Sequence, residues 1–152
     1  MFNDAQKEQL LKPINGSRIA QRKGGGGKQL SYLEAWDVKA HMIRIFGFGG
    51  WSWNVTEAEL MFESEDTGKW NVGYKVIGTL TVGEAVYTEA AVGSSTLPQR
   101  GEAHDMAVKT AESDAFKRAA INLGDQFGLS LYNNGSLKPV VGRTLADGEI
   151  DE

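Results

Sequence analysis

The chain has 152 residues, a formal net charge of −4, 41% hydrophobic residues and no cysteine. This composition predicts one globular domain with a sizeable core, and the lack of cysteine excludes disulfides and thiolate metal sites. No apolar run approaches the roughly 20 residues that a membrane-spanning helix needs, and the N-terminal segment "MFNDAQKEQLLKP" has no apolar signal-peptide core. We therefore expect a cytoplasmic protein with no membrane partner.

The first third of the chain predicts a helix, a short strand and a second helix. Asn3 can cap the first helix, Pro13 ends it, and Gly47 closes the second. The expected elements are a helix over 5–11, a strand around 30–32 and a helix over 33–46. In the second helix the apolar residues at helical spacing are Leu33, Trp36, Ala40, Ile43 and Phe46. Because of this spacing we expect Trp36, like Trp51 and Trp53, to lie in the core.

The middle of the chain predicts a three-stranded antiparallel meander. Alternation of polar and apolar residues indicates strands within 51–64, 70–82 and 85–93, with the turn sequences "EDTGK" and "GE" between them. A long helix is expected over 102–123. Its small and apolar residues fall broadly along one side: Ala103, Met106, Ala107, Ala111, Ala115, Ala119 and Leu123.

This order of elements predicts an α+β fold with a β-β-β-α core. The outer strands of such a meander have unpaired backbone groups. Neighbouring copies in a ring or helical oligomer can cover these edges, and so can a terminal segment that folds back. We expect the domain to span 1–132 and to be followed by an acidic, disordered tail over 133–152.

Four consecutive glycines lie between basic residues in "RKGGGGKQL". A nucleotide-binding P-loop requires G-x-x-x-x-G-K-[ST] after a strand. Here Arg22 stands in place of the first glycine, Gln29 replaces the hydroxyl residue, and no apolar strand precedes the loop. These departures disfavour a nucleotide pocket. A flexible linker and a loop that lets a phosphate backbone approach closely both stay open.

Although the net charge of the chain is negative, the sequence contains two basic segments. The stretch from Lys12 to Lys28 contains five basic residues and no acid, and Lys109, Ser113 and Lys117 recur at helical spacing before Arg118. Such a stripe can follow a phosphate backbone, but acidic residues four positions earlier can instead pair locally with its cations.

Two acidic groupings are candidates for metal chemistry. Asp37-Val-Lys39 has the D-x-K form of some metal-dependent nucleases, although a helix places these two residues on different faces. Glu63, Glu65 and Asp66 at a hairpin tip can bind a divalent cation, although such tips are commonly just solvated. A metal-dependent nuclease is therefore an alternative to a binding protein.

Three motifs appear in order along the chain: "RKGGGGKQLSYLEA" from Arg22, "IFGFGGWSWNV", and "AVKTAESDAFKRAAINLGDQFG". Together they resemble the N-terminal domain of the Rad52 family (Rad52/Rad22) of single-strand annealing recombination proteins, over roughly residues 15–131. The resemblance implies ring-shaped or helical oligomers that hold single-stranded DNA in an outer groove. It also implies no catalytic chemistry and no metal or other cofactor.

Carried over position by position, the resemblance assigns DNA-binding residues. The inner groove falls on Arg22, Tyr32, Lys117 and Arg118. Further DNA contacts fall on Lys23, Lys28 and Lys109. An outer DNA site falls on Lys69 and Arg100. Ile121 stands where relatives have a basic residue, and Tyr32 suits a core position as well as a base contact.

The implied function is ATP-independent binding and annealing of complementary single strands in homologous recombination and double-strand break repair. The expected partners are single-stranded DNA, duplex DNA at a second site, further copies of the chain and a single-strand-binding protein. The chain lacks the long C-terminal half of eukaryotic members, so we expect a phage or bacterial protein. The alternatives are a metal-dependent nuclease, and an end-protection or scaffold module of the same fold that does not anneal.

Overall fold

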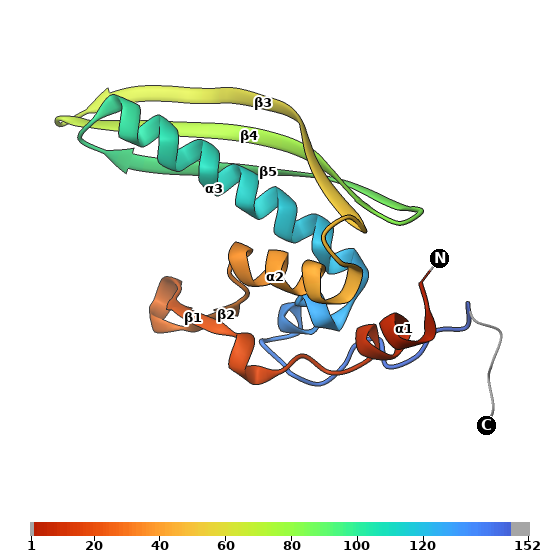
Figure 1. Ribbon diagram of the computed structural model, residues 1–152. Helices are drawn as coiled ribbons and strands as arrows, with labels where there is room; N and C mark the ends of the chain where they lie inside the picture. Colours follow the sequence, from red (N-terminus) through yellow and green to blue (C-terminus); the bar gives the residue numbers. More distant parts are fainter. Residues whose placement is uncertain (1, 147–152) are drawn as a thin grey trace.

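The computed structural model describes residues 2–146 and has the α+β architecture that the sequence predicts (Figure 1). Its helices and strands are α1 (Asp4–Leu10), β1 (Ala20–Lys23), β2 (Gln29–Tyr32), α2 (Ala35–Phe46), β3 (Trp51–Asp66), β4 (Lys69–Val82), β5 (Ala85–Leu97) and α3 (Arg100–Ala120). Short 3-10 turns lie at η1 (Gly16–Arg18), η2 (Gly25–Gly27), η3 (Ile121–Leu123), η4 (Asp125–Phe127) and η5 (Leu129–Tyr132). Within 2–146, no helix is long and apolar enough to cross a membrane.

The three long strands form an antiparallel sheet in the order β3-β4-β5. At the β3–β4 turn, Thr67 and Gly68 both have positive φ (50° and 78°), as tight two-residue hairpin turns require. At the β4–β5 turn, Val82 pairs with Ala85 around a glycine with φ 60°. The meander is therefore confirmed, with the first and third strands longer than predicted.

Helix α3 lies along one face of this sheet (Figure 1). The alanines at every fourth position are fully buried: Ala103, Ala107, Ala111, Ala115 and Ala119. The contact is so close that a Cβ built on Gly93 of β5 would lie 2.4 Å from the backbone nitrogen of Ala111. Small residues on both elements therefore allow the helix to pack directly on the strand backbone.

Two residues of the predicted apolar helix sides, Met106 and Trp36, are exposed, and Trp36 was expected in the core. Met106 is 51% exposed. A helix turns by about 100° per residue, so Met106 lies about 100° around the helix from Ala107, away from the buried alanines. Trp36 is 66% exposed, because α2 buries the face that carries Val38, Met42 and Phe46. Trp36 lies two residues before Val38, which corresponds to about 200° around the helix and places Trp36 on the opposite side.

The remaining elements form a second part of the molecule below the sheet (Figure 1). The short strand predicted around 30–32 is β2, and it pairs antiparallel with β1, which we did not predict. Helix α3 ends at Ala120, three residues before the predicted end, and 3-10 turns follow it. Gly124 and Gly128 connect these turns with φ values of 96° and 98°.

Arg18 and Asp37 tie the N-terminal segment to α2. Asp37 is buried and the Arg18 side chain is only 11% exposed, and the Arg18 guanidinium donates to the Asp37 carboxylate at 2.8 and 3.1 Å. Arg18 also donates to the backbone carbonyl of Gln126 at 2.7 Å. This connection brings the N-terminal segment, α2 and the turns after α3 into one body.

The segment 133–146 contains turns and bends but no helix or strand. The backbone amides of Val140 and Val141 donate to the buried Asp125 carboxylate at 3.1 and 2.9 Å, which holds this part of the chain against η4. The four acidic residues of the tail, Asp147, Glu149, Asp151 and Glu152, lie outside the described residues. The domain boundary at 132 and the disorder of the tail remain predictions.

Candidate nucleic-acid interface

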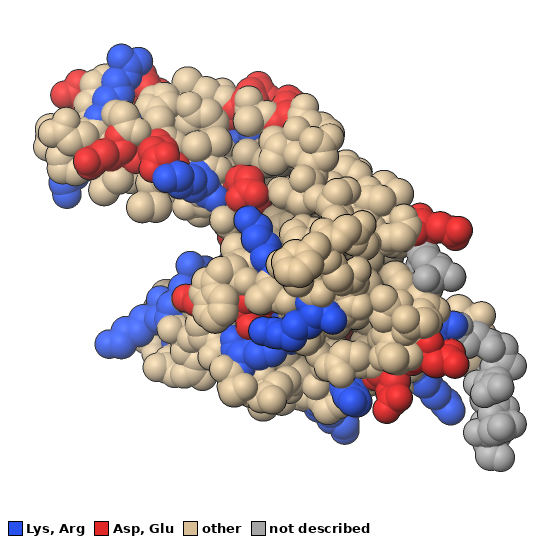
Figure 2. Space-filling model, viewed as in Figure 1, with Lys and Arg blue, Asp and Glu red and all other residues tan. Residues whose placement is uncertain are grey.

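An open groove of about 690 Å³ separates the α3–sheet layer from the β1–β2 hairpin. In Figure 2 the molecule is notched between these two parts, and basic side chains lie on both sides of the notch. All four residues assigned to the inner site line this groove: Arg22, Tyr32, Lys117 and Arg118. Folding therefore brings the first and third sequence motifs together.

The hairpin positions two of these side chains. In the β1–β2 register Arg22 pairs with Leu30, and Ala20 pairs with Tyr32. Residues 22 and 32 are diagonal neighbours on one face of the hairpin. The Arg22 Cζ atom lies 5.5 Å from the centroid of the Tyr32 ring, within cation–π distance.

Helix α3 supplies the other two side chains from its last turn. The Lys117 Nζ atom also lies 5.5 Å from the Tyr32 ring centroid, so this one ring contacts cations from both sides of the groove. Lys117 lies 3.7 Å from Asp114, and Arg118 lies 3.7 Å from Glu89 on β5. Local pairing of Asp114 with Arg118 was one of the two alternatives, but Asp114 lies near Lys117 instead. Both pairs are long and partly exposed, and such pairs are weak.

Comparison with known proteins identifies the family. The sequence matches the family described as "Rad52/22 family double-strand break repair protein" over residues 3–149. The chain belongs to the Rad52/22 family.

Several fungal proteins with curated names are similar to the chain. The chain is 29% identical to the DNA repair and recombination protein rti1 of Schizosaccharomyces pombe over 99% of the chain and 42% of that protein. It is 31% identical to rad22 of the same organism over 91% of the chain and 30% of rad22. It is also 31% identical to RAD52 of Saccharomyces cerevisiae over 86% of the chain and 28% of RAD52. This Rad52/22-family chain thus spans less than half the length of these relatives.

The glycine loop of this Rad52/22-family chain is the tip of the β1–β2 hairpin. Gly26 and Gly27 have φ values of 75° and 77°, which favour glycine, and a Cβ at either would meet nothing within 4 Å. Lys23 and Lys28 flank the tip, and neither lines the groove. The loop is therefore a turn that projects beyond the groove.

Lys109 lies outside the groove although it shares a helical stripe with Lys117. Its Nζ atom lies 2.8 Å from Asp105, and both side chains are exposed. At this position the structure therefore shows local ion pairing and not a cation that faces the groove.

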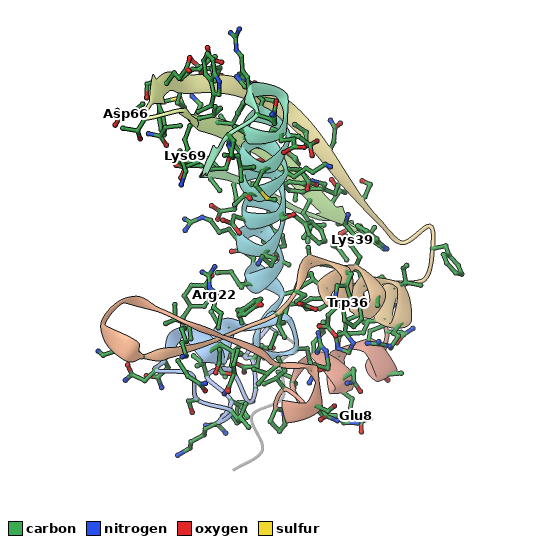
Figure 3. The ribbon with its side chains drawn as sticks, turned by 90° about the vertical axis from the view of Figure 1, so that its left-hand side faces the viewer. Glu8, Arg22, Trp36, Lys39, Asp66 and Lys69 are labelled. Carbon is green, nitrogen blue, oxygen red and sulfur yellow. The ribbon has the colours of Figure 1, made fainter. Side chains whose placement is uncertain are left out.

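The two residues assigned to the outer site lie at the far end of the sheet. Lys69 begins β4 and is labelled in Figure 3, and Arg100 begins α3. The Arg100 guanidinium donates to Glu63 at 2.9 and 3.0 Å and lies 5.0 Å from the Trp70 ring centroid. At about 1.5 Å per residue along α3, Arg100 and Arg118 are roughly 27 Å apart. The inner and outer sites are therefore separate surfaces.

Glu63 belongs to a network of side chains at this far end. Besides Arg100, it contacts the His104 ring, whose other nitrogen lies 2.6 Å from the Tyr74 hydroxyl. The pKa of Glu63 lies below its ordinary value, first because Arg100 donates hydrogen bonds to it and then because His104 does. Glu63 is therefore already paired with cationic and polar partners.

The D-x-K pair has structural partners instead of each other. Asp37 is buried against Arg18, and the Lys39 Nζ atom lies 5.7 Å from the Phe116 ring centroid. Among residues 2–146, no three His, Asp or Glu side chains are placed together to hold a metal ion.

Lys75 and Tyr132 are among the polar residues of the groove that sequence reasoning missed. Lys75 on β4 lines it, with its Nζ atom 3.1 Å from Glu59 and 3.7 Å from Glu57 on β3. Tyr132 in η5 also lines it. Strand alternation alone does not show which face of the sheet borders a groove, and Tyr132 follows the last motif. Ile121 lines the groove too, so the neutral residue noted in the sequence is part of its wall.

Proposed function

We propose that this protein binds single-stranded DNA and anneals complementary strands without ATP, metal or other cofactor, and that it acts in homologous recombination and double-strand break repair. The observation that carries the proposal is the common groove of Arg22, Tyr32, Lys117 and Arg118. Membership of a double-strand break repair family, and relatives named as DNA repair and recombination proteins, support it.

The groove chemistry suits a phosphate backbone. Arg22, Lys117 and Arg118 would contact phosphates, while Tyr32 holds two of these cations in place. Contacts to phosphate do not read sequence, and they leave the base edges free to pair. Once two strands meet, stacking in the new duplex supplies about 1.4 kcal/mol per step, so no external energy source is required.

An oligomer would increase the affinity of these weak contacts. Strand β3 is one of the two edge strands of the sheet and carries exposed apolar side chains at Val55, Leu60, Met61 and Phe62. Exposed apolar edges of this kind favour association with another chain. We propose a ring or helical oligomer in which one strand of DNA passes through successive grooves, so that many weak sites act together.

The outer site would hold duplex DNA or a second strand. Lys69 at the start of β4 would bind a phosphate directly. Arg100 would first have to leave its ion pair with Glu63. Because the Arg100 side chain is 62% exposed, this exchange requires little rearrangement. The glycine-loop lysines, Lys23 and Lys28, would contact the backbone beyond the groove. In the phage or bacterial cytoplasm that we expect as its setting, the protein would meet strands coated by a single-strand-binding protein.

Two alternatives are distinguished by direct assays. A metal-dependent nuclease would shorten labelled single-stranded DNA in magnesium or manganese, and the burial of Asp37 against Arg18 disfavours it. An end-protection or scaffold module would bind strands without increasing the rate at which they pair.

The decisive experiment measures annealing of two labelled complementary oligonucleotides without ATP or metal. Wild type is compared with Arg22→Ala, with the double variant Lys117→Ala/Arg118→Ala, and with Lys109→Ala as a control that removes a cation outside the groove. Light scattering checks that each variant keeps the oligomer of the wild type. We expect wild type and Lys109→Ala to accelerate annealing and the groove variants to lose most of this acceleration. A wild type that binds strands without pairing them faster would disprove the annealing function.

A further inference from the structure

Tyr132 is an aromatic residue of the groove with an unoccupied ring. It lies at the end of η5, lines the groove together with Arg22 and Lys117, and is 68% exposed. Among residues 2–146, its hydroxyl has no hydrogen-bond partner and no cation or aromatic ring lies over its ring. The face of this ring is therefore free to contact a ligand.

The other aromatic residue of the groove is already occupied. The Arg22 Cζ atom and the Lys117 Nζ atom each lie 5.5 Å from the Tyr32 ring centroid. A planar ligand that stacked on Tyr32 would have to displace a cation that also faces the groove. Tyr32 is consequently better suited to position the cations than to stack on a ligand.

The lining of the groove also contains apolar side chains. Leu30, Val92, Ile121 and Leu131 contribute to the same surface as the basic residues, and Leu30 and Val92 are themselves exposed. A ligand complementary to this lining combines anionic groups with a flat apolar group. A single strand of DNA has both, since its unpaired bases expose their faces, whereas a duplex presents only base edges.

We propose that Tyr132 stacks on a base of the single strand whose phosphates Arg22, Lys117 and Arg118 hold. This proposal rests on the proposed function and adds a base contact to it. Stacking uses the face of a base and leaves its pairing edge exposed, so the contact is compatible with annealing. Because every base has such a face, the contact does not select a sequence.

The test compares two oligonucleotides of equal length, one of thymidine and one of abasic sites, by fluorescence anisotropy. Removal of an aromatic platform weakens base binding by roughly 5-fold or more. We expect Tyr132→Leu, which keeps an apolar side chain, to lose this factor on the thymidine strand and to bind the abasic strand like wild type. Tyr132→Phe should retain wild-type affinity for both strands, because the ring remains.

Matched variants separate stacking from other causes. Arg22→Ala removes a phosphate contact and should weaken binding to both strands, whereas Trp36→Ala removes an exposed aromatic side chain outside the groove and should weaken neither. Unchanged affinity of Tyr132→Leu for thymidine, or an equal loss on both strands, would overturn the stacking proposal. A wild type that binds neither strand would instead overturn the proposed function itself.

Discussion

The salt dependence of binding gives a quantitative test of the groove. Each phosphate neutralised on a single strand contributes about −0.7 to the slope of log affinity against log salt concentration. With one phosphate each for Arg22, Lys117 and Arg118, one subunit should show a slope of about −2.1. Replacing Lys117 and Arg118 by glutamine leaves one contact and a slope of about −0.7.

These slopes predict clearly different behaviour in a titration from 50 to 200 mM salt. Wild type should lose roughly 20-fold in affinity for an oligonucleotide that occupies one groove, and the double variant only about 3-fold. Fluorescence anisotropy with a short labelled strand measures both. The neighbouring Asp114 and Glu89 are partly exposed, so loss of their cations should not unfold the protein.

Lys109→Gln is the matched control for this experiment. It removes a cation from the same helix, but Lys109 lies outside the groove and pairs with Asp105. Its slope should equal that of wild type. If the double variant also keeps the wild-type slope, Lys117 and Arg118 do not contact phosphates, and the groove assignment is wrong.

Two further predictions concern the body that supports the groove. Asp37→Ala leaves Arg18 without its carboxylate, so the free energy of unfolding should fall by about 3–5 kcal/mol. The apolar double variant Arg18→Met/Asp37→Leu should change the free energy of unfolding far less. Equal urea midpoints for Asp37→Ala and wild type would contradict this prediction. The pKa of His41 lies below its ordinary value, chiefly because the ring is buried, and Arg18 and Arg44 lower it further. The unfolded chain therefore binds the proton more readily, so stability should be complete above about pH 6.5 and decrease as the pH falls toward the lowered pKa. Urea unfolding at several pH values should show this decrease in wild type and a smaller one in His41→Gln.

Besides burial, which is the largest cause of the lowered pKa of His41, the contact with Gln126 raises this pKa and the contact with Arg44 lowers it. The Gln126 amide nitrogen donates to the carbonyls of Lys12 and Pro13, so its oxygen faces His41 Nε2 at 2.7 Å and accepts a hydrogen bond from the Nε2–H group. Arg44 donates to Nδ1 at 2.8 Å, which requires that nitrogen to be unprotonated. Protonation of the ring would break this last hydrogen bond and place two cations in contact.

Repeated local patterns determined most of the elements correctly. Alternation and turn residues identify β3, β4 and β5, although only β4 and β5 pack extensively against α3. Alanine at every fourth position identifies the buried side of α3. Strand β1 has no such pattern, because its four residues are mainly polar and the strand forms only by pairing with β2.

The buried face of α2 was predicted wrongly for a related reason. Trp36 is apolar and in register with other apolar residues, yet the helix buries Asp37 and His41 instead, since Arg18 and Gln126 satisfy their polar atoms. Partners that lie far away in the chain make these polar residues suitable for the interior. No local pattern contains this information.

The residue types of the candidate site were present in the sequence, but their association depends on tertiary structure. The resemblance selected Arg22, Tyr32, Lys117 and Arg118 individually. Spacing along α3 places Lys109 and Lys117 on one stripe, and only the packing of the hairpin near the last turn separates them. The sequence by itself thus determined the strands, the long helix and the supply of cations. The fold alone decided which cations share a groove, because contacts between distant segments set the distance between phosphate-binding groups.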